Sequence, residues 1–280
     1  MDSIIARIRN RGCVLMLDFD GVLSPIVKLP SEARMSSATR QALTACVKKM
    51  PVAIITGRTL PDIEKRVGLR DVIYAGSHGL EWKIDGRVHR KRIYQKTLSA
   101  FEVARRSLLR HAKLFPEMFV ENKSYGLALG YRSLSTAQAR RFRVGATDIV
   151  KKFDRTSRIR VIDNLYTFEI MPDSEWTKGD CARHIYNTTA KGSALAIYIG
   201  DGLTDEDAFR VFAKSGITIR VGKSHTSFAQ YYFQLRSGVN RFLHNISDDT
   251  NPQKHPFQKK FTLAKGGGNP GTSTAFLEKI

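Results

Sequence analysis

Three short apolar runs, at residues 13–17, 51–55 and 72–76, constrain the fold of this chain more than any other feature. They are continuous rather than alternating, which is typical of strands buried on both faces of a sheet. Segments with helical periodicity separate them, at residues 36–50 and 60–67. This alternation of strand and helix predicts an α/β fold, with a parallel sheet and helices on both of its faces.

The pattern changes in the middle of the chain. From about residue 79 to 169, apolar and polar residues alternate as in half-exposed strands, and Asp85-Gly86 fits a hairpin turn. A continuous apolar run returns at residues 194–199. We therefore expect residues 1–80 to form the first part of a core, 81–170 an inserted α+β cap, 171–250 the second part of the core, and 251–280 a flexible basic tail.

The charge of the chain favours an anionic partner. Among 280 residues, 46 Lys and Arg oppose 26 Asp and Glu, which gives a net charge of +20. Residues 83–160 alone contain 20 basic and 6 acidic side chains. Nucleic acid is the obvious candidate, but charge by itself is about as compatible with a solvated, solubilising surface as with a functional one.

Cysteine usage and hydropathy indicate the compartment. The three cysteines, Cys13, Cys46 and Cys181, are widely spaced, so the sequence predicts neither a disulfide framework nor a cysteine zinc site. No uninterrupted apolar stretch reaches the length needed to span a bilayer. We expect a cytoplasmic protein without a membrane partner; the sequence gives no indication of its oligomeric state.

Asp18 and Asp20 follow the first apolar run directly. While the chain stays extended, residues two apart point to the same side, so the two carboxylates are expected to form a pair. Close carboxylates repel each other unless a cation offsets the charge, and Mg²⁺ is the natural choice because it prefers hard oxygen ligands. A strand-end aspartate can also simply cap the following helix.

Hydrolysis of a phosphate ester through an aspartyl phosphate needs a carboxylate nucleophile, a proton donor and groups that hold the phosphate. Asp18 suits the nucleophile, and Asp20 suits the acid that later acts as a base. Thr56, Gly57 and Arg58 follow the second apolar run, where a hydroxyl and free N–H groups can bind phosphate oxygens. Lys178 stands at a predicted helix start and could clamp phosphate and nucleophile together, although an isolated Lys-Gly is usually surface.

A dense acidic segment follows the run at residues 194–199, with carboxylates at Asp201, Asp205, Glu206 and Asp207. Asp201 lies at the strand end and is the better candidate for a metal ligand. Asp205 could support the metal waters or Lys178. The last two acids could serve only to complement a helix dipole.

Taken together, these motifs resemble the haloacid dehalogenase superfamily, and the flanking residues resemble its trehalose-6-phosphate phosphatase branch. The similar runs are residues 18–25, 54–58, 74–81, 121–123, 131–132, 168–170, 178–179, 197–209 and the terminal helix at 227–243. The resemblance implies a Rossmann-like core with a mobile cap of the C2B type. It also implies that Asp18 is nucleophile and metal ligand, Asp20 is acid and base with its carbonyl on magnesium, Asp201 is the third ligand, and Thr56 and Lys178 hold the phosphate.

The resemblance extends to the expected substrate contacts. It places Glu121, Lys123 and Glu169 of the cap on the disaccharide, and it adds Arg132, His78, Gly57 and Arg58 to the substrate-binding set. For His78 we expect loop shaping rather than metal binding. Gly202 departs from the family pattern because a second acid usually stands at that position, which bears on metal binding.

The sequence thus predicts a magnesium-dependent phosphomonoester hydrolase that acts on trehalose 6-phosphate. Two alternatives stay open. The same chemistry could act on another sugar phosphate, such as glucosylglycerate or mannosylglycerate phosphate, because cap contacts set specificity. The fold could also belong to a non-catalytic regulator that binds a polyanion such as nucleic acid, a reading disfavoured by the intact catalytic set.

Overall fold

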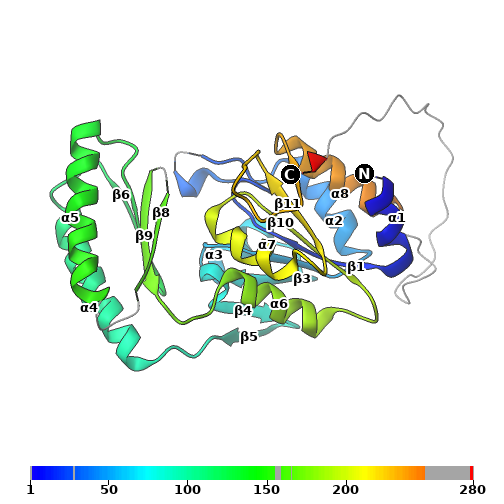
Figure 1. The fold of residues 1–280 in the computed structure, drawn as a ribbon, viewed down its shortest axis with the longest axis horizontal. Helices are drawn as coiled ribbons and strands as arrows, with labels where there is room; N and C mark the ends of the chain where they lie inside the picture. The colour runs from blue at the N-terminus through cyan, green and yellow to red at the C-terminus, as the bar shows by residue number, and fades with distance from the viewer. Residues whose placement is uncertain (1, 28, 155–158, 165, 250–277, 280) are drawn as a thin grey trace.

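The computed structural model describes residues 2–27, 29–154, 159–164, 166–249 and 278–279 (Figure 1). Its larger part is a nine-stranded sheet of order β13-β12-β11-β10-β1-β2-β3-β4-β5. The strands from β12 to β3 are parallel, and those outside them are antiparallel. The strands are β1 (Cys13–Leu17), β2 (Val52–Ile55), β3 (Val72–Gly76), β4 (Glu81–Ile84), β5 (Arg87–Arg90), β10 (Leu195–Gly200), β11 (Ile217–Val221), β12 (Tyr231–Phe233) and β13 (Glu278–Lys279).

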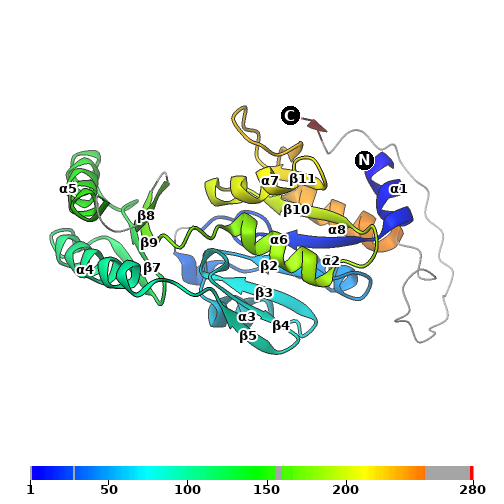
Figure 2. The ribbon, with the colours of Figure 1, turned by 60° about the horizontal axis from the view of Figure 1, so that its bottom comes forward.

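Helices cover both faces of this sheet, as the continuous apolar runs predicted (Figures 1 and 2). Along β1, Leu15 and Leu17 face one apolar cluster, whereas Val14 and Met16 face the other. The first cluster includes residues of α1 (Asp2–Arg11), α2 (Ser37–Val47), α3 (Leu60–Val67) and α8 (Ser237–Asp249). The second includes residues of α6 (Lys178–Thr189) and α7 (Glu206–Phe212). The α/β core is confirmed.

Local signals set the helix ends. The Ser36 hydroxyl accepts a hydrogen bond from the backbone N–H of Thr39 at 3.1 Å and so caps α2. Gly68 ends α3 in the left-handed conformation, with φ of 61°. Because β10, β1 and β2 are parallel neighbours, the loops that leave their carboxyl ends meet at one edge of the sheet.

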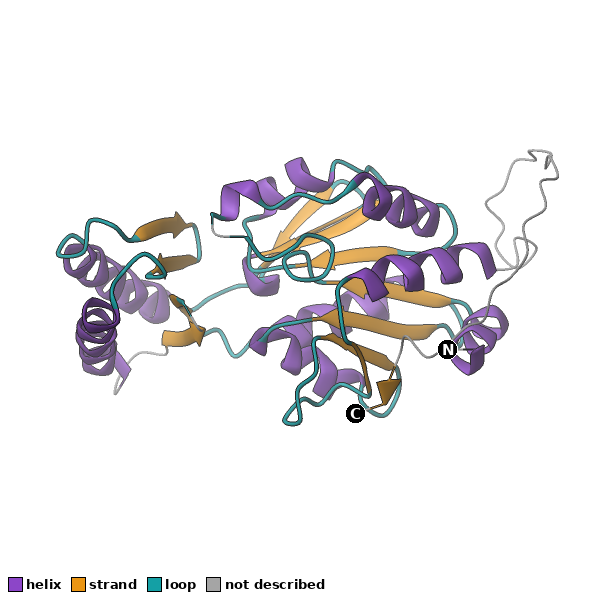
Figure 3. Ribbon diagram, turned by 90° about the horizontal axis from the view of Figure 1, so that it is seen from above, coloured by secondary structure: helices purple, strands orange, loops and turns teal. Residues whose placement is uncertain are grey.

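A smaller antiparallel sheet, of order β6-β7-β9-β8, lies between β5 and α6 in the sequence. It is joined to the core by two connecting segments (Figure 3). The strands are β6 (Phe119–Lys123), β7 (Gly126–Gly130), β8 (Ile159–Asn164) and β9 (Thr167–Pro172). Helices α4 (Gln95–Ala112) and α5 (Thr136–Asp154) pack on one face around Phe101, Leu108 and Phe142. We call this part the cap.

The expected start of the cap at residue 81 is wrong. The hairpin of β4 and β5 turns at Asp85 and Gly86, as predicted, but it extends the core sheet because β4 pairs with β3. Trp82 explains this placement: it is buried in the core and its ring stacks on Trp176 with centroids 5.9 Å apart. The cap therefore begins after Arg90.

The expected flexible tail, residues 251–280, lies outside the described residues except for Glu278–Lys279. Those two residues form β13, an antiparallel edge strand beside β12. Within the described part of the chain, no helix has the length and hydropathy needed to cross a membrane.

Candidate active site

Asp18 and Lys178 form a buried ion pair at the carboxyl edge of the core sheet. Asp18 directly follows β1, and its Oδ2 lies 2.7 Å from Lys178 Nζ. Lys178 is the first residue of α6, where Thr177 and Asp180 cap each other's backbone. The same Nζ lies 2.7 Å from Asp205 Oδ1. Burial lowers the pKa of Lys178, but the two carboxylates outweigh it and hold that pKa above its ordinary value, so the ammonium form is retained.

Three carboxylates gather around this pair. Asp18, Asp201 and Asp205 each offer an oxygen, and these oxygens lie within 4.8 Å of one another. Burial, reinforced by Asp205, raises the pKa of Asp201 to about 7. Burial also raises the pKa of Asp18 despite the attraction of Lys178. Closely spaced carboxylates with raised pKa values are suited to hold a divalent cation, because a cation offsets the repulsion that protonation otherwise relieves.

Asp205 holds the loop at residues 201–202 in place through hydrogen bonds to its backbone. It is fully buried, and its carboxylate accepts hydrogen bonds from the Tyr198 hydroxyl at 2.7 Å and from the backbone N–H groups of Asp201 and Gly202 at 3.1 and 3.0 Å. With Lys178, these donors outweigh the effect of burial and lower the pKa of Asp205. Of the two roles expected for Asp205, this geometry matches support of Lys178.

A glycine is required where the turn after Asp20 meets the loop that carries Asp201. Gly21 has φ of 75°, and a Cβ atom there would lie 2.0 Å from Asp201 Oδ2. The turn after Asp20 therefore provides both the backbone conformation and the space that the Asp201 carboxylate occupies.

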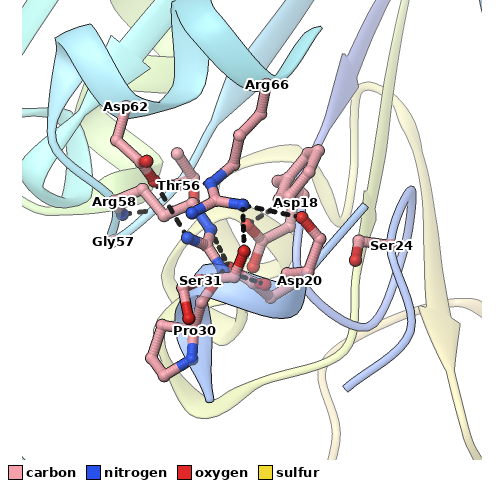
Figure 4. Close-up of polar contacts among 12 residues, drawn as sticks. Asp18, Asp20, Ser24, Pro30, Ser31, Thr56, Gly57, Arg58, Asp62 and Arg66 are labelled. Carbon is pink, nitrogen blue, oxygen red and sulfur yellow. Dashed lines mark hydrogen bonds and ion pairs between the residues drawn. The ribbon is translucent and has the colours of Figure 1, made fainter. Parts of the chain in front are cut away.

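The Asp20 carboxylate is not paired with that of Asp18, so this expectation is wrong. Instead, Arg58 Nε and Nη2 donate to the two Asp20 oxygens at 2.7 and 2.8 Å (Figure 4). Arg58 also donates to Asp62 Oδ2 at 2.9 Å, and Arg66 donates to the same oxygen at 2.8 Å. Alternation along an extended strand does not apply here, because β1 ends at Leu17 and the chain enters a turn at Phe19. The bidentate guanidinium then fixes the direction of Asp20.

Thr56, Gly57 and His78 pack together in the loops that follow β2 and β3, and we call them the β2–β3 wall. Thr56 is buried at the end of β2, and its hydroxyl accepts a hydrogen bond from the Arg58 backbone at 3.3 Å. His78 has φ of 57°, and its ring packs so closely that a Cβ on Gly57 would lie 2.5 Å from it. The expectation that His78 shapes this loop agrees with the packing.

The cap adds three charged residues above this wall. Lys123 Nζ lies 2.9 Å from Glu169 Oε1 and 3.7 Å from Glu121 Oε2, and it donates to the Gly57 carbonyl at 3.1 Å. Glu169 Oε2 lies 3.4 Å from His78 Nε2. Burial raises the pKa of Glu169, but Lys123 and His78 outweigh it and hold that pKa well below its ordinary value. The structure thus brings together the three cap residues predicted from sequence.

Arg132 is not brought to the site. Its guanidinium lies over the Tyr166 ring, 4.7 Å from the centroid, and the residue is exposed. Pairing of Lys123 with Gly126 places the start of β7 beside the site, whereas Arg132 follows the other end of β7. A motif next to a strand does not show which end of the strand faces the ligand.

Sequence reasoning missed two residues that hold the site in place. Tyr198 lies within the apolar run at residues 194–199, and its hydroxyl, which needs a partner when buried, is the signal in the sequence. Asp62 stands on the helix expected at residues 60–67, four residues after Arg58, a spacing that favours an ion pair.

A parallel core sheet, an inserted α+β cap and a buried Asp-Lys-Asp contact at the carboxyl edge define the haloacid dehalogenase type of fold. The chain belongs to the trehalose-phosphatase family: the model of that family matches residues 16–236.

Known relatives agree with this membership. The chain is similar to trehalose-phosphate phosphatase of Mycobacterium tuberculosis H37Rv, with 35% identity over 79% of this chain and 55% of the relative. It is also similar to probable trehalose-phosphate phosphatase 4 of Oryza sativa, with 31% identity over 86% and 68% of the two chains. The chain therefore spans little more than half the length of the mycobacterial relatives.

A solved structure agrees on the fold. The trehalose-6-phosphate phosphatase C-terminal domain of C. albicans superposes with a TM-score of 0.73 at 21% identity, over 88% of this chain and 96% of that one. At this level of identity the likeness concerns the fold alone.

Proposed function

We propose that this chain hydrolyses trehalose 6-phosphate to trehalose and inorganic phosphate through a phospho-Asp18 intermediate. The observation that carries the proposal is the buried contact of Asp18 with Lys178, beside the carboxylates of Asp201 and Asp205. A carboxylate held by an ammonium at the open edge of a parallel sheet has the position and the partner that a nucleophile needs. Family membership supports the choice of substrate.

The first step transfers the phosphoryl group to the protein. A carboxylate oxygen of Asp18 forms a bond to phosphorus while the bond between phosphorus and the sugar oxygen breaks, and Asp20 supplies the proton that the leaving oxygen takes up. Lys178, the Thr56 hydroxyl and the N–H group of Gly57 stabilise the phosphate oxygens.

The second step hydrolyses the aspartyl phosphate and regenerates the Asp18 carboxylate. Asp20 accepts a proton from a water molecule whose oxygen attacks phosphorus, the bond to Asp18 breaks, and phosphate leaves. Arg58 orients the Asp20 carboxylate for this role. Asp20 must carry its proton before the first step, which requires the Arg58 contact to loosen, and a substrate phosphate that takes over the guanidinium would provide this.

Asp18, Asp201 and the Asp20 carbonyl would hold a magnesium ion. Their oxygens are the hard ligands that Mg²⁺ prefers, and the carboxylates lie close enough to share one cation. A bound ion neutralises charge on the phosphoryl group and keeps it in place for attack. Asp205 has a supporting role, because its oxygens already accept from Lys178, Tyr198 and two amides. Gly202 contributes an N–H to Asp205 rather than a ligand.

In this proposal Glu121, Lys123 and Glu169 bind the sugar hydroxyls. Carboxylates and ammonium groups are good partners for hydroxyls, and a closed cap excludes water from the acyl phosphate. The same groups contact one another and the core here, so a disaccharide competes for contacts that already exist.

We also propose a reducing, cytoplasmic setting. All three cysteines are free and buried. Burial raises the pKa of the Cys46 thiol to about 12, which keeps it protonated and unreactive.

The test is phosphate release from trehalose 6-phosphate and from a panel of other sugar phosphates, with magnesium and with EDTA. The variant Asp18→Asn should lose activity on every substrate. Asp71→Asn, which changes an exposed carboxylate before β3, should retain it. No magnesium-dependent release from any substrate would rule out the enzyme. Release from others but not from trehalose 6-phosphate would rule out only the substrate, and salt-sensitive RNA binding without hydrolysis would favour a polyanion-binding regulator.

A further inference from the structure

The polar side-chain contacts between cap and core, among the described residues, are of two kinds. Lys123 donates to the Gly57 carbonyl at 3.1 Å, and Glu169 lies 3.4 Å from His78. Both contacts use cap side chains that the proposed function assigns to the sugar. A ligand that engages Lys123 and Glu169 weakens these contacts, so they cannot by themselves keep the cap closed during turnover.

The other kind is an ion pair that uses no proposed sugar ligand. Arg160 Nη2 on β8 donates to Asp207 Oδ2 in the first turn of α7 at 2.7 Å. Arg160 shares a strand face with Ile162, which packs on Leu80 of the core, so this side of β8 faces the core. The side chains of Arg160 and Asp207 are 27% and 18% exposed, so this ion pair is better shielded from solvent than a typical surface pair.

Gly57 and Asp207, two core residues that the cap contacts, lie on opposite sides of β1 in the core sheet. Gly57 follows β2 and Asp207 lies on the segment that follows β10, and these two strands flank β1, whose end carries Asp18. The cap therefore contacts the loops on both sides of the proposed nucleophile. The Asp207 contact also joins the cap to the segment that carries Asp201 and Asp205.

We propose that the Arg160–Asp207 ion pair is the latch that holds the cap closed over a disaccharide phosphate once the ligand has engaged Lys123 and Glu169. This rests on the proposed function. Arg160 and Asp207 are positioning residues: they act through the closed cap and do not contact reacting atoms. Closure matters for a substrate that reaches the cap, and it matters little for a small aryl phosphate that fits against the core alone.

The experiment compares Arg160→Gln, Asp207→Asn and the charge swap Arg160→Asp with Asp207→Arg. Steady-state kinetics are measured with trehalose 6-phosphate and with p-nitrophenyl phosphate. The matched control is Arg143→Gln, which breaks an exposed ion pair with Asp163 that lies wholly within the cap. We expect each single variant to lower kcat/KM for trehalose 6-phosphate about tenfold, mainly through KM, since a shielded charged hydrogen bond contributes about this much.

Activity on p-nitrophenyl phosphate should change less than about twofold. The swap should recover part of the loss, because Arg210, which contacts Asp207 Oδ1 at 3.3 Å, opposes an arginine at position 207. The latch is overturned if the swap recovers nothing, if both substrates lose equally, or if Arg143→Gln has the same effect as Arg160→Gln.

A second readout does not depend on turnover. Hydrogen exchange of the connecting segments, residues 91–94 and 173–177, is measured with excess trehalose, so that a disaccharide engages Lys123 and Glu169. It should be faster in Arg160→Gln than in the wild type and in Arg143→Gln, and the swap should restore it. Unchanged exchange in Arg160→Gln would overturn the latch even if the enzyme is active. Faster exchange in a protein that releases no phosphate would support the latch while ruling out the proposed function.

Discussion

Core and cap meet at the site, but they hold their charged residues in different ways. In the core, Lys178 and Asp205 are sealed at the end of a parallel sheet, with 1% and 0% of their side chains exposed. In the cap, Glu121 and Lys123 lie on the edge strand β6, with 31% and 9% of their side chains exposed, and Lys123 contacts the core through the Gly57 carbonyl. The core can thus keep its chemistry in any cap position, whereas the cap contributes only when closed. Mutations in the core should therefore reduce activity on every substrate, whereas mutations in the cap should reduce activity only on the substrate that the cap recognises.

The largest effect is expected at Lys178, on the core side of this comparison. Lys178→Met removes the ammonium between Asp18 and Asp205 and leaves two buried carboxylates without their cation. We expect loss of at least about 10³-fold in kcat on trehalose 6-phosphate and on p-nitrophenyl phosphate alike, with a destabilisation of about 3–5 kcal/mol. Kinetics and urea unfolding measure both. Lys191→Met, at an exposed lysine, is the control, and a Lys178 variant that keeps its aryl phosphate activity would contradict the assignment.

A substrate-selective loss is expected on the cap side. Glu169→Gln removes the charge that pairs with Lys123 and His78, so kcat/KM for trehalose 6-phosphate should fall about 100-fold. Turnover of p-nitrophenyl phosphate should stay within about threefold, because the core chemistry is untouched. The control Glu117→Gln changes an exposed cap carboxylate. Equal losses on the two substrates would place Glu169 in the chemistry rather than in sugar recognition.

The raised pKa of Asp201, a core residue, predicts that the thermal stability of the protein depends on pH. Its pKa is about 7 in the folded protein against an ordinary value of 3.8, so between these values the folded state binds more protons than the unfolded state. Stability in EDTA should therefore fall as pH rises from about 4 to 7, lowering Tm by about 5 °C. Magnesium should restore Tm most at the upper end of that range. Calorimetry of the wild type and Asp201→Asn checks this, and an identical pH dependence in the two proteins would refute it.

The same contrast explains how much could be predicted from sequence. Continuous runs such as Cys13–Leu17 identify a buried strand, and the polar residues after them must meet at one sheet edge, so Asp18, Thr56 and Asp201 could be placed together. The direction of Asp20 could not, since it depends on Arg58, a residue distant in sequence. Nor could the hairpin at Glu81–Arg90 be assigned to the core, because alternation shows that a strand has one exposed face but not which sheet it joins.

The smallest effect, and the one that best tests this account of the cap, is expected at Arg132. The family resemblance places it among the substrate ligands, whereas here it stacks on Tyr166 beyond the end of β7 that is remote from Lys123. Arg132→Gln should therefore change kcat/KM for trehalose 6-phosphate less than about twofold, because an exposed cation and ring contribute little. A loss comparable to that of Glu169→Gln, with the aryl phosphate unaffected, would show that substrate binding rearranges the cap enough to bring this arginine to the sugar. The cap would then recognise its ligand by changing shape, and the cap contacts described above would belong to one of several arrangements.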